Sequence, residues 1–200
     1  MIDTVNIAMA LFLGIGLSAA CGFRIFIPPF ALSLAALNGT VELSPDWQWV
    51  GSYPAVAVFA IATVIEVLAY FVPWVNNALD SVEVFAAPVV GTFLTASTLS
   101  MAGEFNPIMT WVVAAIAGGG TAEVIEGASV LARFATAGLT AGVGTPAVSL
   151  AEMLSSIILS VLAILVPFLA FVLVIFLVIY CLRRLARLRR QRKRARQLDN

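Results

Sequence analysis

"GFRIFIPP", residues 22–29, places an arginine and two prolines between two strongly apolar runs. Arg24 is an ionisable group in apolar sequence, and such groups are costly inside a membrane. Pro28 and Pro29 lack a backbone N–H and interrupt helical hydrogen bonding. Irregular backbone at membrane depth must face protein or a water-filled cavity. The stretch therefore predicts that the prolines end a helix inside a bundle, with Arg24 beside the break.

The composition of the whole chain indicates an integral membrane protein. Of its 200 residues 62% are hydrophobic and 11% are charged, and the mean hydropathy is +1.04. A soluble domain of this size carries about 25% charged residues. We expect an all-α, polytopic transmembrane bundle over residues 1–182, with membrane lipids as partners.

Apolar runs predict about five spans, because about 20 apolar residues cross the hydrocarbon core. Such runs occupy residues 5–22, 51–72, 86–101 and 147–182, and a helical stretch with three charges covers 121–137. The run 147–182 would exceed ~50 Å as one helix, against a core of ~30 Å. We expect it to tilt, to kink at Pro167 or to project into the cytoplasm. A hairpin is less favoured because no polar turn surrounds Pro167.

Shorter segments predict one or two half-length or re-entrant pieces. Residues 30–39 are apolar but only half a span long, and residues 108–117 form a short run that the glycines 118–120 should end. Residues 74–85 are more polar and suit an interfacial helix or a turn. The turn at 38–47 carries tryptophan, which favours the membrane–water interface.

The C-terminal residues 183–200 form a basic tail that contains nine of the eleven Lys and Arg residues. By the positive-inside rule, this tail is expected on the cytoplasmic side of an inner membrane, where it can touch anionic headgroups. Because the tail has no aromatic residue, nucleic-acid binding is not expected.

Several charged residues lie within or beside the predicted spans, where they are expected to face the bundle interior. Helical spacing places Glu66 with Thr63, and Glu152 with Ser149, Ser156 and Ser160, on single faces. Acids outnumber bases, so we expect Arg24 to point inward at Glu66, Glu126 or Glu152. The residues predicted to line one polar cavity and to bind a substrate or ion are Arg24, Glu66, Asp80, Glu126, Arg133 and Glu152.

Two interpretations of these charges remain open. They can be structural pairs that pin the helices together, as polar contacts do in membranes. Alternatively, they form a site for a small solute or ion, and the excess of acids then favours a cation or proton. The second interpretation predicts a transporter or transport subunit, which is the leading hypothesis.

Other functions are also possible on this sequence. The chain could be a non-catalytic subunit of a larger membrane complex, or it could bind a lipid headgroup through Arg24. We expect a homo-oligomer or a larger complex, because five spans enclose little volume. Enzyme chemistry, a cofactor and a metal are not expected, because histidine is absent and no nucleotide-binding or nucleophile motif occurs.

Motifs in the order "GLSAACGFRIFIPPFALSLAA", "EVLAYFVPWVNNALD", "AAPVVGTFL", "GGGTAEVIEGASVLARFATAGL" and "TPAVSLAE" resemble a family of small bacterial multi-pass membrane proteins, domain of unknown function 4126. The resemblance runs from about residue 10 to 170. It implies the same architecture and marks Arg24, Glu66, Asp80 and Arg133 as family positions. The chain departs from the family at Glu126, Ser129 and Met153, where His, Lys and Asp are common. The family itself implies no reaction.

Overall fold

The computed structural model describes residues 4–69, 73–103, 106–140 and 144–198, and about 90% of the chain is helical. No strand occurs in those ranges, which confirms the predicted all-α class. The elements are α1 (Thr4–Cys21), α2 (Ile27–Leu37), the 3-10 helix η1 (Pro45–Gly51), α3 (Tyr53–Ala69), α4 (Pro73–Leu99), the 3-10 helix η2 (Ser100–Ala102), α5 (Pro107–Val113), the π-helix η3 (Ala114–Gly119), α6 (Gly120–Thr140), α7 (Thr145–Leu165) and α8 (Pro167–Leu198).

Four helical segments are long and apolar enough to cross a membrane, and a fifth is possible if η1 and α3, bent by 55°, form one span. The four segments are Thr4–Cys21, Ser81–Ala102, Pro107–Gly138 and Pro146–Leu165. The prediction of about five spans with half-length pieces is confirmed, since α2 is a short apolar helix of eleven residues.

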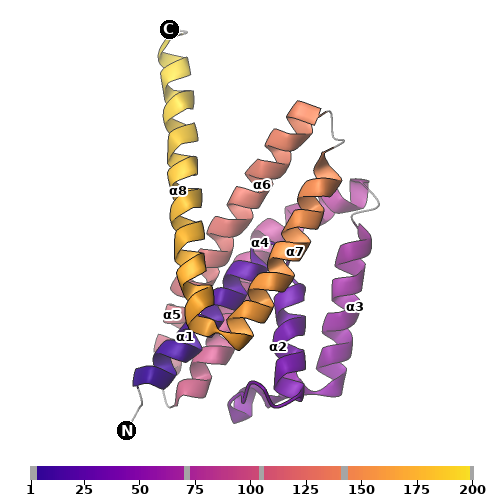
Figure 1. Ribbon diagram of the computed structural model, residues 1–200, viewed down its shortest axis with the longest axis vertical. Helices are drawn as coiled ribbons and strands as arrows, with labels where there is room; N and C mark the ends of the chain where they lie inside the picture. The colour runs from indigo at the N-terminus through magenta and orange to yellow at the C-terminus, as the bar shows by residue number, and fades with distance from the viewer. Residues whose placement is uncertain (1–3, 70–72, 104–105, 141–143, 199–200) are drawn as a thin grey trace.

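Helix α1 lies at the centre of the bundle and packs against α4, α7 and α8 (Figure 1). Along the chain, α3, α6 and α8 run toward the end where the C-terminus lies, and α4 and α7 run back (Figure 1). We call that end the tail end, because α8 projects from it beyond the other helices. The N-terminus and the connection between α2 and α3 lie at the opposite end.

The break that the sequence places near residues 22–29 is present, but the prolines have another role than predicted. Helix α1 already ends at Cys21, and Pro28 and Pro29 lie in the first turn of α2. Proline suits a helix start because the N–H groups of the first turn have no partner within the helix. The prolines therefore begin the second helix, and they do not end the first.

Small residues let α1 approach its neighbours closely. A Cβ on Gly16 would lie 2.7 Å from the Cβ of Ala163 on α7. Toward α4, the Ser18 hydroxyl donates to the Gly91 carbonyl at 2.7 Å and lies 2.9 Å from the Thr95 hydroxyl. Close backbone approach and interhelical hydrogen bonds both hold membrane helices together, because lipid provides no hydrophobic force between them.

Two segments for which the sequence left a turn or a helix end open are parts of continuous helices. Residues 74–85 belong to α4, so of the two predicted alternatives the turn is wrong. The glycines 118–120 do not end a helix, because η3 continues into α6. Both Gly118 and Gly119 pack against α4, where an added Cβ would lie 2.5 Å from the Gly91 carbonyl oxygen and 2.9 Å from that of Pro88. This packing outweighs the cost of about 1 kcal/mol for glycine in a helix.

The long apolar run 147–182 is a hairpin, which is the alternative that the sequence disfavoured. Helix α7 ends at Leu165 and α8 begins at Pro167, and both extend from this bend toward the tail end (Figure 1). Val166 adopts φ −140° and ψ 72° and still donates its N–H to the Leu162 carbonyl at 2.8 Å. Pro167 has no N–H to leave unpaired. A reversal therefore needs no polar turn here.

The outward faces of the bundle are apolar, which fits an integral membrane protein. On α3, the side chains of Val58, Ile61, Val64, Ile65 and Leu68 are each more than half exposed. Contiguous apolar surface of this kind is rare on soluble monomers. Lipid is the solvent that suits it.

A pair of glycine substitutions tests the close packing. Gly91→Ala should lower the free energy of unfolding by about 1–3 kcal/mol, because its Cβ would lie 2.8 Å from the Ala122 Cβ and 3.0 Å from the Gly118 carbonyl oxygen. Gly127→Ala, with nothing within 4 Å of the new Cβ, should raise it by about 0.5–1 kcal/mol. Thermal unfolding in detergent, followed by circular dichroism, measures both. Equal effects of the two substitutions would contradict the packing.

Candidate functional site

Charged side chains from four helical regions meet in the interior of the bundle. Arg24 follows α1, Glu83 lies on α4, Glu126 and Arg133 lie on α6, and Glu152 lies on α7. Each is at most 5% exposed. We call these five residues the charge network.

Arg24 enters the charge network from the break between α1 and α2. Its Nη2 atom donates to Glu152 Oε2 at 2.9 Å, and its Nη1 atom lies 3.8 Å from Glu83 Oε1. The break itself is hydrogen-bonded, since the N–H groups of Phe23 and Arg24 both donate to the Ala20 carbonyl. Arg24 therefore joins the centre of the bundle to α4 and α7.

Arg133 contacts three carboxylates of the charge network. Its Nη2 atom donates to Glu126 Oε1 at 3.1 Å, and Glu126 lies seven residues, or about two turns, earlier on α6. Its Nε atom lies 3.5 Å from Glu152 Oε1, and its Nη1 atom lies 3.8 Å from Glu83 Oε2. Glu83 and Glu152 thus each lie between the two arginines, and the four helical regions are linked as one unit.

Glu66 on α3 binds the backbone of the break. Its two carboxylate oxygens accept the N–H groups of Ile25 at 2.8 Å and of Phe26 at 3.3 Å. These groups precede α2, whose N-terminus carries partial positive charge and favours an anion. Because Ile25 directly follows Arg24 in the chain, Glu66 adjoins the charge network.

Carboxylates exceed guanidinium groups in this part of the bundle. Glu66, Glu83, Glu126 and Glu152 face Arg24 and Arg133, which leaves two formal negative charges when every carboxyl group is ionised. An uncompensated buried charge is expensive, and such groups bind a proton or a cation instead. Among the residues that the structure describes, no set of three or more His, Cys, Asp and Glu is arranged to hold a metal ion.

A stripe of serines on α7 continues the polar surface beyond Glu152. Ser149, Glu152, Ser156 and Ser160 are all buried, as their helical spacing predicts. The Ser156 hydroxyl donates to the Ala20 carbonyl at 2.9 Å and so pairs the C-terminal end of α1. The stripe therefore holds α7 against the broken end of α1.

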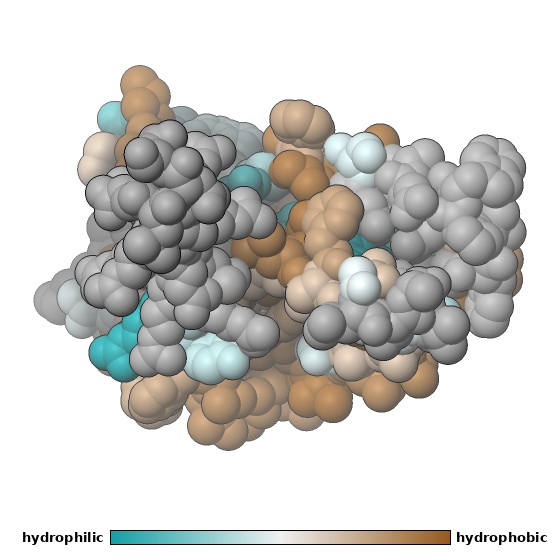
Figure 2. Space-filling view, turned by 90° about the horizontal axis from the view of Figure 1, so that it is seen from above, coloured by the Kyte–Doolittle hydropathy of each residue, from teal (hydrophilic) through white to brown (hydrophobic). Residues whose placement is uncertain are grey.

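A cavity of about 320 Å³ between α6, α7 and α8 reaches the charge network. Most of its lining is apolar, with Leu131, Leu177 and Tyr180 among the side chains, and Glu152 and Ser129 provide polar atoms. Figure 2 looks onto the tail end, where a few hydrophilic residues lie recessed between hydrophobic ones. Through Glu152, this mostly apolar cavity borders the charge network.

The structure brings together most of the residues that the sequence singled out. Arg24, Glu126, Arg133 and Glu152 belong to the charge network, and Glu66 adjoins it. Asp80 lies in α4, but its side chain is outside the described part of the structure. Whether these residues bind a substrate stays a prediction.

Glu83 is the member of the charge network that the sequence reasoning missed. Its polar neighbours in residues 74–85 suggested an interfacial position. A usable signal was the four-residue spacing of Glu83, Ala87, Gly91 and Thr95, which puts one acid in line with three small residues on one helix face. All four are buried.

The comparisons with known proteins agree with the resemblance that the motifs carry. A family model described as "Domain of unknown function (DUF4126)" matches residues 11–187, which is most of the chain. Neither a search of curated proteins nor a search of solved structures found a match.

Removing both partners of one ion pair in the charge network should destabilise the bundle by less than the sum of the two single removals. Arg24→Met leaves Glu152 and Glu83 without their bond to this guanidinium and should cost about 3–5 kcal/mol of unfolding free energy. Combining it with Glu152→Met should cost less than the sum of the two single substitutions. Unfolding in detergent measures all three variants. Additive costs would contradict the coupling of Arg24 and Glu152.

Glu66→Gln tests whether this side chain holds the break. A glutamine has one acceptor oxygen, so one of the N–H groups of Ile25 and Phe26 loses its partner, at about 1–3 kcal/mol. Hydrogen–deuterium exchange in residues 24–30 should become about tenfold faster or more. Thr63→Ala is the control. In the part of the chain that the structure describes, the Thr63 hydroxyl donates only to the Phe59 carbonyl of the same helix. Unchanged exchange in Glu66→Gln would argue against the assigned role.

Proposed function

We propose that this chain, which belongs to the DUF4126 family, is a transporter or transport subunit that moves a small solute or ion by way of its charge network. The proposal places the protein in the inner membrane, with the basic tail in the cytoplasm according to the positive-inside rule. The tail end of the bundle then faces the cytoplasm.

The excess of carboxylates over guanidinium groups is the observation that carries the proposal. Insertion of a charged side chain at the bilayer centre costs ~2.5–3.5 kcal/mol, and buried ionisable groups commonly mark ion and proton pathways. Arg24 and Arg133 balance two of the four carboxylates described here. The remaining charge is compensated by a proton or cation, which makes the network a site that can bind and release one.

The broken helix supports the same function. Interrupted helices place free backbone groups at the binding sites of many transporters, near the membrane midplane. Here the break between α1 and α2 contributes Arg24 and is held by Glu66. Protonation of Glu66 would weaken its hold on two N–H groups, so the ionisation of this site can be coupled to movement of α2.

A purely structural role, in which the ion pairs only hold the helices together, explains less of the geometry than an ion or solute site does. Equal numbers of acids and bases would suffice to tie helices together, and buried pairs of this kind contribute little net stability. A lipid-headgroup site at Arg24 is also less favoured, because two carboxylates already contact this guanidinium and its side chain is 0% exposed.

We further propose that the protein catalyses no covalent reaction. Each carboxylate described in the site contacts a guanidinium group or a backbone N–H, which suits charge compensation better than attack on a substrate.

The apolar faces of α3 and α5 suit contact with lipid or with a second copy of the chain.

Transport can be tested in proteoliposomes that contain the pH-sensitive dye pyranine. Candidate solutes and inorganic cations are added outside under an imposed pH gradient, and internal pH is followed. We expect the wild-type protein to accelerate flux for at least one solute or for protons, and Glu126→Gln to reduce that flux by about tenfold or more.

Glu123→Gln is the matched control, because Glu123 lies three residues earlier on α6 and its side chain is exposed. Both variants must elute as the wild type does in size-exclusion chromatography. A change of internal pH equal to that in protein-free liposomes would reject transport of protons and proton-coupled transport of the solutes tested. Equal flux in the two variants would reject the charge network as the site.

A further inference from the structure

We propose that a pocket at the end opposite the tail binds a ligand through an alkylammonium group. The pocket is separate from the charge network and from the cavity beside α8. The inference goes beyond the proposed function and does not depend on it, since it concerns binding at another surface of the protein.

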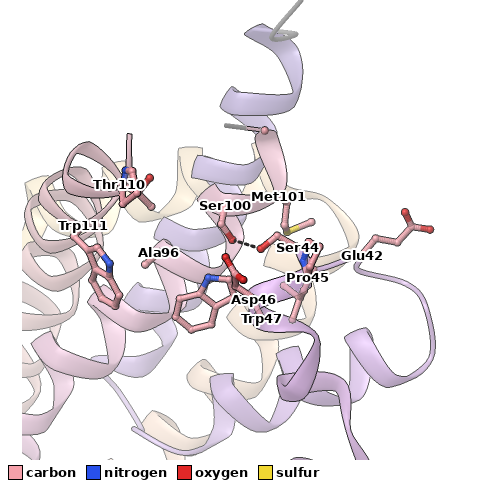
Figure 3. A pocket seen from close by; sticks show the side chains of 13 residues that line it. Glu42, Ser44, Pro45, Asp46, Trp47, Ala96, Ser100, Met101, Thr110 and Trp111 are labelled. Atoms are coloured by element: carbon pink, nitrogen blue, oxygen red, sulfur yellow. Dashed lines mark hydrogen bonds between the residues drawn. The ribbon is translucent and has the colours of Figure 1, made fainter. Parts of the chain in front are cut away.

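The pocket has a volume of about 880 Å³ and lies where three parts of the chain meet. The segment before η1 contributes Glu42, and η1 itself contributes Asp46 and Trp47. The end of α4 contributes Ala96, and α5 contributes Trp111 (Figure 3). These parts are far apart in the sequence. A cavity of this size exceeds the volume of one ion and can hold an organic molecule.

Two indole rings line the pocket beside Ala96. The ring centroids of Trp47 and Trp111 are 6.3 Å apart, and their planes are inclined by 48°. Phe93 packs against Trp47 in a T-shaped arrangement at 4.7 Å, which positions that indole. Figure 3 shows the two indoles on either side of Ala96, with the Asp46 carboxylate close to Trp47. Aromatic faces with a nearby carboxylate favour a cation, and tryptophan is the strongest aromatic partner.

This end of the protein provides carboxylates without a basic residue to pair them. All eleven basic residues are Arg24, Arg133 and the members of the tail. The first two belong to the charge network, and the tail begins at Arg183 on α8, which leads to the other end (Figure 1). In the described ranges, neither Glu42 nor Asp46 forms a salt bridge. A positively charged ligand supplies the missing partner.

The chemistry of the walls distinguishes an organic cation from a metal ion. Hard cations need about six oxygen ligands, whereas the indoles offer π faces. Figure 3 shows Glu42 at the rim, with its carboxylate directed away from the two indoles, so that Asp46 alone places a charge beside them. One carboxylate and two aromatic rings match a single weakly hydrated ammonium group.

Contacts within the protein hold the walls of the pocket in place. Buried Val41 and Leu43 anchor the segment that carries Glu42, and the hydroxyls of Ser44 and Ser100 lie 3.0 Å apart, which ties this segment to η2. A preformed site avoids part of the entropy cost of binding. The ammonium group can belong to a free solute or to a lipid headgroup, since tryptophans favour the membrane–water interface.

Choline chloride is the probe, titrated by calorimetry into the protein in phosphatidylglycerol nanodiscs at low ionic strength. Its neutral isostere, 3,3-dimethylbutan-1-ol, has the same shape without the charge. We expect saturable choline binding, at least about tenfold tighter than binding of the isostere. Asp46→Asn and Trp111→Leu should each weaken choline binding by about 3- to 30-fold.

Two matched controls separate the pocket from general effects. Glu123→Gln removes an exposed carboxylate on α6, and Trp49→Leu removes an exposed indole that does not line the pocket. Both should bind choline as the wild type does. Absence of saturable choline binding, equal binding of the isostere, or unchanged binding in both pocket variants would overturn the proposal.

A second titration distinguishes a lipid headgroup from a free solute as the source of the ammonium group. The choline titration is repeated in nanodiscs that also contain phosphatidylethanolamine, a lipid with a primary ammonium headgroup. Weaker apparent choline binding there supports a headgroup as occupant of the pocket. Unchanged binding supports a free solute.

Discussion

The burial of Arg24 is the constraint on which the rest of the structure depends. A guanidinium group keeps its charge in proteins, so its burial in an apolar bundle requires carboxylates beside it. Glu152 and Glu83 provide them, and Arg133 then balances these acids together with Glu126. Since the members come from α4, α6, α7 and the end of α1, one buried charge determines how four helical regions are arranged.

The break between α1 and α2 and the close helix packing both contribute to the charge network around Arg24. Helix α1 stops at Cys21, which brings Arg24 into the interior, and Glu66 and Ser156 pair the backbone groups that the break frees. Small residues such as Gly16 and Gly91 let the neighbouring helices approach α1 closely enough for these contacts. We propose that the acid-rich network and the aromatic, acidic pocket at the end opposite the tail each bind a positively charged ligand.

Much of this architecture follows from local sequence. Apolar length alone predicts the helical class, about five spans and the half-length α2. Helical periodicity predicts that Glu152 and its three serines share a buried face, and the scarcity of bases predicts an acid partner for Arg24. These predictions succeed because span length, periodicity and charge balance are properties of short segments and of composition.

Tertiary contacts decided what local sequence could not. Glu83 looks interfacial from its neighbours and is buried because α4 passes both arginines. The glycines 118–120 continue a helix because α4 packs against them, and the chain reverses at Val166 because α7 and α8 both pack against α1. The sequence by itself determined a membrane-embedded helical bundle with more buried acids than bases. Only the tertiary structure decided which charges meet, because pairing depends on helices that are distant in sequence and adjacent in space.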